Sequence, residues 1–174
     1  CEKGLNASII HPSGIFGPND FKPSLFGQEF INIANGKRSY TVNIGYDYVD
    51  VRDLCTTAIN CIEKGESKQN YIVGGNYIDF IGIGEVLSKK LNKQLIKGTL
   101  PFFFVYLSLP SSYLKALFFN KPRSATLDSI HTVKVQNKLI PSNLAKEMLD
   151  HRPRPVDETI NDTVEFFQKR GLIN

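Results

Sequence analysis

The sequence is poor in cysteine, and the number and spacing of its cysteines exclude a disulfide framework and a cysteine metal site. Three cysteines in 174 residues do not form a disulfide framework. Cys55 and Cys61 fall on one expected helix, at a spacing that suits neither a shared helix face nor a pair of metal ligands. Free thiols are typical of a reducing compartment, so we expect a cytoplasmic protein.

The common catalytic and nucleotide-binding motifs are also missing. The chain contains no P-loop, no His-x-x-x-His, no Cys-x-x-Cys and no Gly-x-Ser-x-Gly sequence. Gly82-Ile83-Gly84 has Leu87 where a dinucleotide fingerprint needs its third glycine. No tyrosine is followed four residues later by a lysine, so the chain contains no Tyr-x-x-x-Lys sequence. These absences leave no recognisable catalytic motif in the chain.

No hydrophobic run is long enough to span a membrane. The most apolar segment, residues 100–119, is broken by Pro110 and carries Lys115, so neither half reaches the roughly 20 apolar residues that a span needs. We interpret it as helices that cover a core or a partner surface, with a membrane-surface helix as the alternative. The net charge of +4 is mild and the basic residues are scattered, which does not suit a nucleic-acid-binding protein.

The feature around which the rest is organised lies near the start of the chain. The run Leu5–Ile10 predicts a buried strand of a parallel sheet. Residues His11–Pro18 follow it and contain two prolines and two glycines, which predict a tight loop. Loops at the carboxyl ends of parallel strands are where α/β proteins bind ligands. An ordinary strand-to-helix loop is the alternative interpretation.

The remaining segments alternate between helical and strand patterns. Asp53 is the expected N-cap of a helix that turns Leu54, Ala58, Ile59 and Ile62 inward. The pattern therefore predicts one α/β unit over residues 1–174. The other expected helices are 24–36, 83–91, 125–133, 141–148 and 155–170, and the other expected strands are 40–42, 46–51 and 70–75.

Several separated pieces together resemble the C-terminal part of an extended short-chain dehydrogenase/reductase, of the NAD-dependent epimerase/dehydratase family. Within that family they are most similar to the dihydroflavonol 4-reductase-like subgroup, in which the form Val-Asp-Val-Arg-Asp occurs. The expected fold is the last parallel strands of a Rossmann-like fold with a small, mostly helical substrate-binding lobe. The pieces are residues 10–18, where His11 replaces the usual Arg, residues 48–54 and 70–75, and the tail 152–167.

The resemblance implies a division of labour between this chain and an N-terminal part. In the family, that part carries the glycine-rich fingerprint for NAD or NADP and a Tyr-x-x-x-Lys pair that transfers protons. Here, Pro12 and Ser13 would lie along the nicotinamide and the backbone N–H of Ile15 would hold its carboxamide. Asp20 and Phe21 would line the substrate pocket. Their alternative roles are a solvated turn and a core aromatic.

Two positions bear on the substrate class that the resemblance implies. Nucleotide-sugar epimerases tend to carry Arg where this chain has Tyr46, and His where it has Asp50. A guanidinium grips phosphate with paired donors that a phenol does not offer. We therefore expect a substrate other than a nucleotide sugar, and a role for Asp50 in holding a loop by hydrogen bonds rather than in catalysis.

The sequence leaves two classes of function open. In the first, the chain is the substrate-binding part of an NAD(P)-dependent reductase or epimerase, and the isolated chain is inactive. In the second, it is a non-catalytic binding or interaction module, with residues 100–119 as an interface or a membrane-surface contact. The segment Cys1–Gly4 looks like the end of a helix, so we expect a longer parent chain. A truncated sheet would have an open edge through which the chain dimerises or aggregates.

Overall fold

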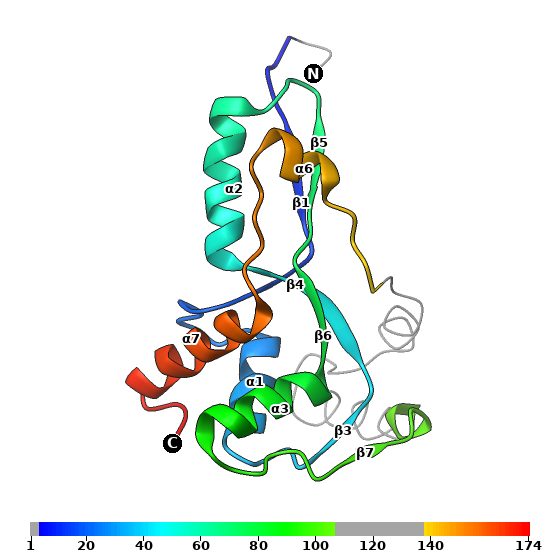
Figure 1. The fold of residues 1–174 in the computed structure, drawn as a ribbon, viewed down its shortest axis with the longest axis vertical. Coiled ribbons are helices and arrows are strands. Elements are labelled where there is room, and N and C mark those ends of the chain that lie inside the picture. Colours follow the sequence, from blue (N-terminus) through cyan, green and yellow to red (C-terminus); the bar gives the residue numbers. More distant parts are fainter. Residues whose placement is uncertain (1–3, 107–137) are drawn as a thin grey trace, which may run out of the picture.

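The computed structural model describes residues 4–106 and 138–174. The described residues form an elongated α/β molecule with an upper and a lower part joined near the middle (Figure 1). The elements are β1 (Ile9–Pro12), β2 (Gly14–Phe16), α1 (Leu25–Ala34), β3 (Tyr40–Val42), β4 (Gly45–Asp50), α2 (Val51–Lys64), β5 (Asn70–Val73), β6 (Asn76–Asp79), α3 (Phe80–Leu91), β7 (Gly98–Leu100), α6 (Asn143–Met148) and α7 (Val156–Lys169).

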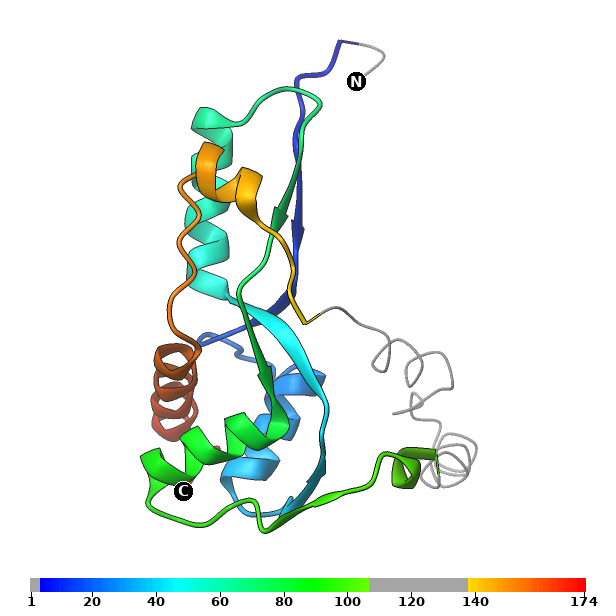
Figure 2. The same ribbon diagram turned by 45° about the vertical axis from the view of Figure 1, so that its right-hand side comes forward.

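The upper part is a parallel pair of strands covered on one side. β1 pairs with β5 in the register Ile9 opposite Asn70 to Pro12 opposite Val73. Helices α2 and α6 lie on the same side of this pair (Figure 2). The side chains between the strands and the helices form a small core of Val49, Tyr71, Val73, Ala145 and Leu149.

The lower part contains the larger core. β4 is the middle strand, parallel to β2 and antiparallel to β6, and a parallel pair of β3 and β7 closes the lower tip. Helices α1, α3 and α7 pack together against this sheet because each carries an apolar stripe at helical spacing. The most deeply buried members of the core are Phe30, Ile33, Ile83, Leu87, Ile160, Val164 and Phe167.

Most expected elements occur, with two differences at the start. The chain does not leave the sheet at His11: β1 runs to Pro12, and a second strand, β2, resumes at Gly14. The reason is that the chain changes partner at Ser13, from β5 to β4. Strands β6 and β7 were not expected. The expected helix 125–133, His131 and residues 107–119 lie outside the described residues.

The prediction for α2 was wrong in two ways. Asp50, not Asp53, is the N-cap, since its carboxylate accepts the backbone N–H of Arg52. Ile59 and Ile62 face outward rather than inward. The helix turns Asp53 and Thr57 inward instead, because the segment leading to α7 runs along α2 and binds these two polar side chains.

Candidate functional site

The candidate site lies where the chain passes from β1, which pairs with β5, to β2, which pairs with β4. The backbone N–H of Ser13 donates to the carbonyl of Val73, 3.0 Å away, which is the last bond of β1 to β5. From Gly14 onward the chain pairs with β4. A Cβ on Gly14 would lie 3.0 Å from both the carbonyl oxygen of Asp47 and the ring of Tyr48, so a larger residue would force a small shift of its neighbours. The crossing thus brings the backbone of Gly14 close to β4.

The three residues expected to meet a cofactor lie together on this crossing. Pro12 is exposed, and Ile15 is 51% exposed although its side chain is apolar. The hydroxyl of Ser13 is buried and has no hydrogen-bond partner among the described residues. A buried hydroxyl without a partner is unfavourable unless another group completes it. Their arrangement fits a polar ligand group such as a nicotinamide carboxamide.

A cavity of about 290 Å³ opens beside Ile15, on the loop between β2 and α1. The residues after β2 and after β4 meet there, which is the carboxyl edge of this parallel pair. Most of the wall is apolar, and Asp20 is its one charged side chain. The lining residues are Ile15, Phe16, Gly17, Pro18, Asn19, Asp20, Ser24, Val51 and Phe167.

The two residues expected to line the substrate pocket have different positions. Asp20 lies in the cavity wall, where its carboxylate also accepts the backbone N–H of Ser24 at 2.8 Å. Ser24 in turn caps α1, as expected, by accepting the N–H of Gly27. Phe21 is not in the wall: its ring stacks edge-on against Phe166, with the Arg170 guanidinium 5.2 Å away. Asp20 thus orders the loop that forms the cavity.

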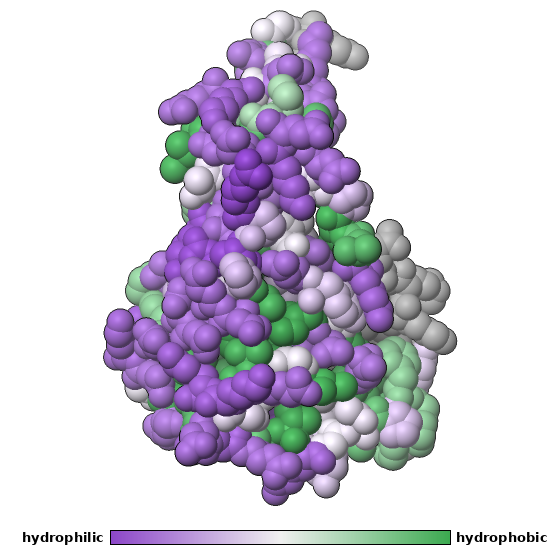
Figure 3. All heavy atoms as spheres, viewed as in Figure 1, coloured by the Kyte–Doolittle hydropathy of each residue, from purple (hydrophilic) through white to green (hydrophobic). Residues whose placement is uncertain are grey.

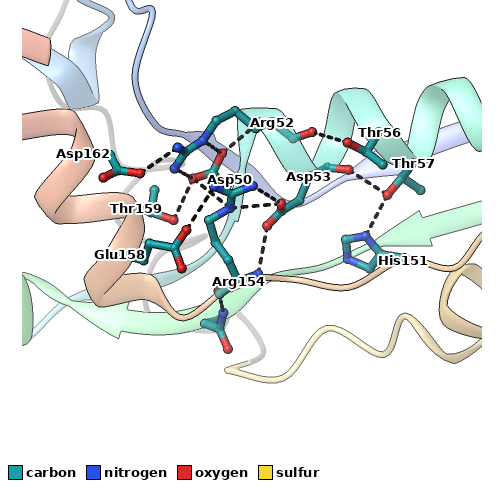
Figure 4. A network of polar contacts seen from close by, with 11 residues as sticks. Asp50, Arg52, Asp53, Thr56, Thr57, His151, Arg154, Glu158, Thr159 and Asp162 are labelled. Carbon is teal, nitrogen blue, oxygen red and sulfur yellow. Dashed lines mark hydrogen bonds and ion pairs between the residues drawn. The ribbon is translucent and has the colours of Figure 1, made fainter.

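Figure 4 shows a network of polar contacts where β4 becomes α2, next to the start of α7. Asp50 is buried where β4 becomes α2, and a Cβ on Gly17 would lie 3.4 Å from its carboxylate. The Asp50 carboxylate accepts from the Arg52 guanidinium at 2.7 and 3.0 Å and from the Thr159 hydroxyl at 2.8 Å. Arg52 also donates to Asp162 at 2.6 Å. Asp50 therefore joins the start of α2 to α7. Its carboxylate lies next to Gly17 of the loop, and the role of holding that loop by hydrogen bonds stays a prediction.

Asp53 holds the segment that precedes α7. Its carboxylate accepts from the backbone N–H and the guanidinium of Arg154, at distances from 2.6 to 3.0 Å. Arg154 also donates to Glu158 at 3.2 Å. Sequence reasoning missed Arg154, although it lies in the Arg-Pro-Arg-Pro tail that carried part of the resemblance. The spacing of about a hundred residues between the partners gave no local signal.

The electrostatics of the network follow from its geometry. Burial by itself raises the pKa of the Asp50 carboxyl, but hydrogen bonds from Arg52 and Thr159 outweigh it and hold that pKa below its ordinary value. The hydrogen bond to Asp50 raises the pKa of Arg52, and the one to Asp53 raises that of Arg154. Asp50, Arg52 and Arg154 are therefore charged at neutral pH. The carboxylates of Asp50 and Asp53, which these arginines bind, are occupied by structural partners rather than free for proton transfer.

The histidines do not form a catalytic centre in the part of the chain that is described. His151 is buried, with Nδ1 2.8 Å from the Thr57 hydroxyl and Nε2 2.7 Å from the carbonyl of Gly74. His11 is exposed and lies 3.1 Å from the Asn70 side chain. No cluster of described residues could hold a metal ion, and no described helix is long and apolar enough to cross a membrane.

Tyr46 lies on β4 with its ring next to that of Tyr48. It is half-buried, and burial raises the pKa of its phenol. Burial also raises the pKa of Tyr48, with the neighbouring Tyr46 as a second cause. Both phenols are therefore neutral, and neither side chain offers the positive charge that would hold a diphosphate.

Two curated proteins match nearly the whole chain. It is 26% identical over 174 residues to "Sterol demethylase protein B" of Methylococcus capsulatus, a match that covers 98% of this chain and 52% of that protein. It is 23% identical over 180 residues to the "Putative dihydroflavonol 4-reductase" of Synechocystis, covering 99% and 51%. The chain thus spans about half the length of the curated relatives it matches. No protein-family model matches it.

Solved structures share the fold. The crystal structure of gox2253 superposes with a TM-score of 0.79 at 26% identity, over 99% of this chain and 52% of that one. A nucleoside-diphosphate-sugar epimerase from Pseudomonas aeruginosa gives 0.72 at 17% identity, over 99% and 51%. UDP-glucuronic acid 4-epimerase from Bacillus cereus, solved with UDP-glucuronic acid and NAD, gives 0.66 at 12%, over 95% and 46%. These matches confirm the Rossmann-like α/β class and the resemblance to half of a dihydroflavonol 4-reductase-like or epimerase/dehydratase protein.

Proposed function

We propose that this chain, which resembles half of a dihydroflavonol 4-reductase-like protein, forms the substrate side of an NAD(P)-dependent oxidoreductase or epimerase that acts on a carbonyl or alcohol. The cofactor would supply the hydride chemistry, and this chain would position the nicotinamide and the substrate. The free thiols favour a reducing compartment, so we place the enzyme in the cytoplasm.

The observation that carries the proposal is the strand crossing at Ser13 beside an apolar cavity. The buried Ser13 hydroxyl lacks a partner, and the exposed Pro12 and Ile15 flank it. We assign Pro12 and Ser13 to the nicotinamide, and the backbone N–H of Ile15 to its carboxamide. Asp20, in the cavity wall, and Phe21, one residue further on, would contact the substrate.

The chemistry of the wall bears on the substrate. No lysine or arginine is among the residues that line the cavity, and Tyr46 stands where nucleotide-sugar epimerases tend to carry Arg. Binding a diphosphate in an apolar wall without a cation would leave its charge unpaired. We therefore propose a substrate without phosphate groups.

The proton-transfer pair of the family would come from a part of the fold outside these residues. The chain contains no Tyr-x-x-x-Lys sequence. The Asp20 carboxylate in the cavity wall accepts the backbone N–H of Ser24, and those of Asp50 and Asp53 are bound to Arg52 and Arg154. We therefore propose that the isolated chain binds neither NAD(H) nor NADP(H) tightly and is inactive, and that a parent protein with both halves is active.

The test compares the chain alone with the protein encoded by its whole reading frame. The longer protein should oxidise NADH or NADPH in the presence of a carbonyl substrate, and the chain alone should not. In the active protein, Ser13→Ala should raise the KM for the cofactor about fivefold to tenfold, since about 1 kcal/mol is typical of one hydrogen bond. Ser67→Ala, at an exposed serine in the loop before β5, is the control. A reading frame without a glycine-rich fingerprint and a Tyr-x-x-x-Lys pair would support an interaction module instead.

A further inference from the structure

A second change of strand partner lies beside the one at Ser13. β5 pairs with β1 up to Val73, and β6 pairs with β4 instead. Gly74 and Gly75 connect the two strands, and we call residues 73–75 the crossing turn. The backbone N–H of Ser13 donates to the carbonyl of Val73 at 3.0 Å. The position of Ser13 therefore depends on that of the crossing turn.

Two side chains bind the peptide group between Gly74 and Gly75. Its carbonyl oxygen lies 2.7 Å from Nε2 of His151, and its N–H donates to the carboxylate of Asp47 at 2.6 Å. A carbonyl oxygen only accepts, so Nε2 carries a proton and donates it to this bond. Glycine backbones are otherwise free to adopt many conformations. The orientation of this peptide group therefore depends on the bonds from His151 and Asp47.

The imidazole of His151 is buried although its neighbours in the sequence face water. His151 lies between α6 and α7, and Asp150 and Arg152 on either side of it are exposed. The surface of the upper part is mostly hydrophilic in the view of Figure 3, yet His151 is only 1% exposed. Burying a polar ring is unfavourable unless its nitrogen atoms are hydrogen-bonded. The bonds that this ring makes are therefore the reason for its inward position.

The second ring nitrogen of His151 fixes the direction of the first. Nδ1 lies 2.8 Å from the Thr57 hydroxyl, which is also 2.8 Å from the backbone carbonyl of Asp53 (Figure 4). The backbone N–H of His151 donates to the carbonyl of Ala145 at 3.1 Å. In histidine, the bond of one ring nitrogen determines the role of the other. The ring is thus attached to α2 and α6, and its Nε2 is directed at the crossing turn.

We propose that His151 is a positioning residue for the cofactor site, because it fixes the crossing turn and, through that turn, the buried hydroxyl of Ser13. Nε2 of His151 and the N–H of Ser13 bind the carbonyls of adjacent residues, so a rotation of one peptide group displaces the other. The inference rests on the proposed function, in which Ser13 contacts the nicotinamide. It deepens that function by naming a residue that acts on the cofactor without touching it.

Amide hydrogen exchange on this chain tests the coupling without a cofactor. His151→Asn removes the donor to the crossing turn, because the amide nitrogen of Asn reaches only the place of Nδ1. The ratio of the protection of the Ser13 amide to that of Ile9, which donates to Gln69 from the same strand, should then fall about fivefold. His151→Gln, whose amide nitrogen reaches the place of Nε2, should keep this ratio within about twofold of the wild type.

Leu149→Ala is the matched control for a merely structural effect. It removes a fully buried side chain from the small core of the upper part, but no bond to the crossing turn. It should lower the protection of the Ser13 and Ile9 amides alike and leave their ratio unchanged. If His151→Asn does not fold, Thr57→Val, which frees the ring from α2, should lower the ratio in the same direction.

Kinetics of the protein encoded by the whole reading frame test the effect on the cofactor. His151→Asn should raise the KM for NADH or NADPH about fivefold and leave that for the carbonyl substrate within about twofold, and His151→Gln should restore the cofactor KM. In a Ser13→Ala background, His151→Asn should change the cofactor KM less than about twofold, because its effect passes through the Ser13 hydroxyl.

The outcomes separate this inference from the proposed function. The positioning role is overturned if the loss of the histidine, or of Thr57 in its place, leaves the ratio unchanged, or if Leu149→Ala lowers the ratio as much. It is also overturned if the protein is active and the effects of His151→Asn and Ser13→Ala on the cofactor KM are simply additive. A ratio that falls as expected, in a protein that oxidises neither NADH nor NADPH, would keep the role of His151 in placing Ser13 and reject the proposed function.

Discussion

The junction of β4, α2 and α7 differs from the open side of the upper part in how far its groups are satisfied. The open side is the free edge of β1 and the outer face of β1 and β5, with Ile9 and Ile72. At the junction, the carboxylates of Asp50 and Asp53 are fully engaged by two arginines and a threonine. On the open side, apolar side chains and a strand edge have no described partner. The contrast indicates that the polar groups at the start of α2 are satisfied by described residues, whereas the apolar side chains Ile59 and Ile62 on its other flank are exposed.

The difference also explains where the site lies. Gly17 of the cavity loop lies next to Asp50 in the junction, and the strand crossing at Ser13 connects β1 on the open side to β2 beside the junction. The residues expected to bind the cofactor thus lie between these two regions. In doubly wound folds, this boundary between two halves is a common place for a cofactor.

The largest expected contrast is between an isoleucine-to-alanine substitution in the buried core and the same substitution on the exposed flank of α2. Ile160→Ala removes a fully buried side chain from the lower core and should lower the free energy of unfolding by about 2–5 kcal/mol. Ile62→Ala removes an exposed side chain from a helix and should change it by less than about 0.5 kcal/mol. Urea denaturation of the isolated chain measures both. Equal losses would show that Ile62 already packs against something.

The next prediction concerns substitutions that remove hydrogen bonds at the junction of β4, α2 and α7. Asp50→Ala removes the N-cap of α2 and leaves Arg52 and Thr159 without their main acceptor, so it should cost about 2–4 kcal/mol. Asp162→Ala removes the more exposed partner of the same arginine and should cost at most about 1 kcal/mol. The measurement is again urea denaturation. If the two substitutions cost the same, Asp50 is not the centre of the network.

A smaller effect is expected from pH. The pKa of Asp50 is lower in the folded chain than in the unfolded one, so its contribution to stability is present above the unfolded pKa of about 3.9 and is lost as the pH falls through the folded pKa. The free energy of unfolding should therefore drop below about pH 4. Asp50→Asn should make this drop shallower, and Asp157→Asn, at an exposed carboxylate, should not. Parallel pH profiles of the wild type and Asp50→Asn would contradict the assignment.

Much of the fold could be predicted from local patterns. The caps at Ser24 and Pro155 and the apolar stripe of α7 lie within a few residues of one another, so the sequence shows them directly. The family resemblance supplied the Rossmann-like class, which periodicity alone does not give. The N-cap of α2 was assigned to the wrong residue because both Asp50 and Asp53 suit that role. Asp53 binds Arg154 instead, and a residue so distant in the sequence gives no local signal.

The candidate site was predictable in position but not in detail. The loop after the first strand was expected at a ligand-binding edge, and the structure places a cavity there. The assignment of Ile59 and Ile62 to a core failed because α2 turns its polar residues Asp53 and Thr57 inward, where distant residues bind them, and so leaves the two isoleucines exposed. The roles of Pro12, Ser13, Ile15, Asp20 and Phe21 stay predictions.

Amide hydrogen exchange on the isolated chain, resolved by residue and measured at high dilution, tests the contrast most directly. The account predicts that the N–H of Ile10, at the free edge of β1, exchanges with little protection. The amides of α7 near Ile160 should exchange only by global unfolding, and those of Ile9 and Ser13, which donate to Gln69 and Val73, should fall between. An Ile10 amide as protected as that of Ile160 would contradict the claim that the outer edge of β1 is unpaired in the isolated chain.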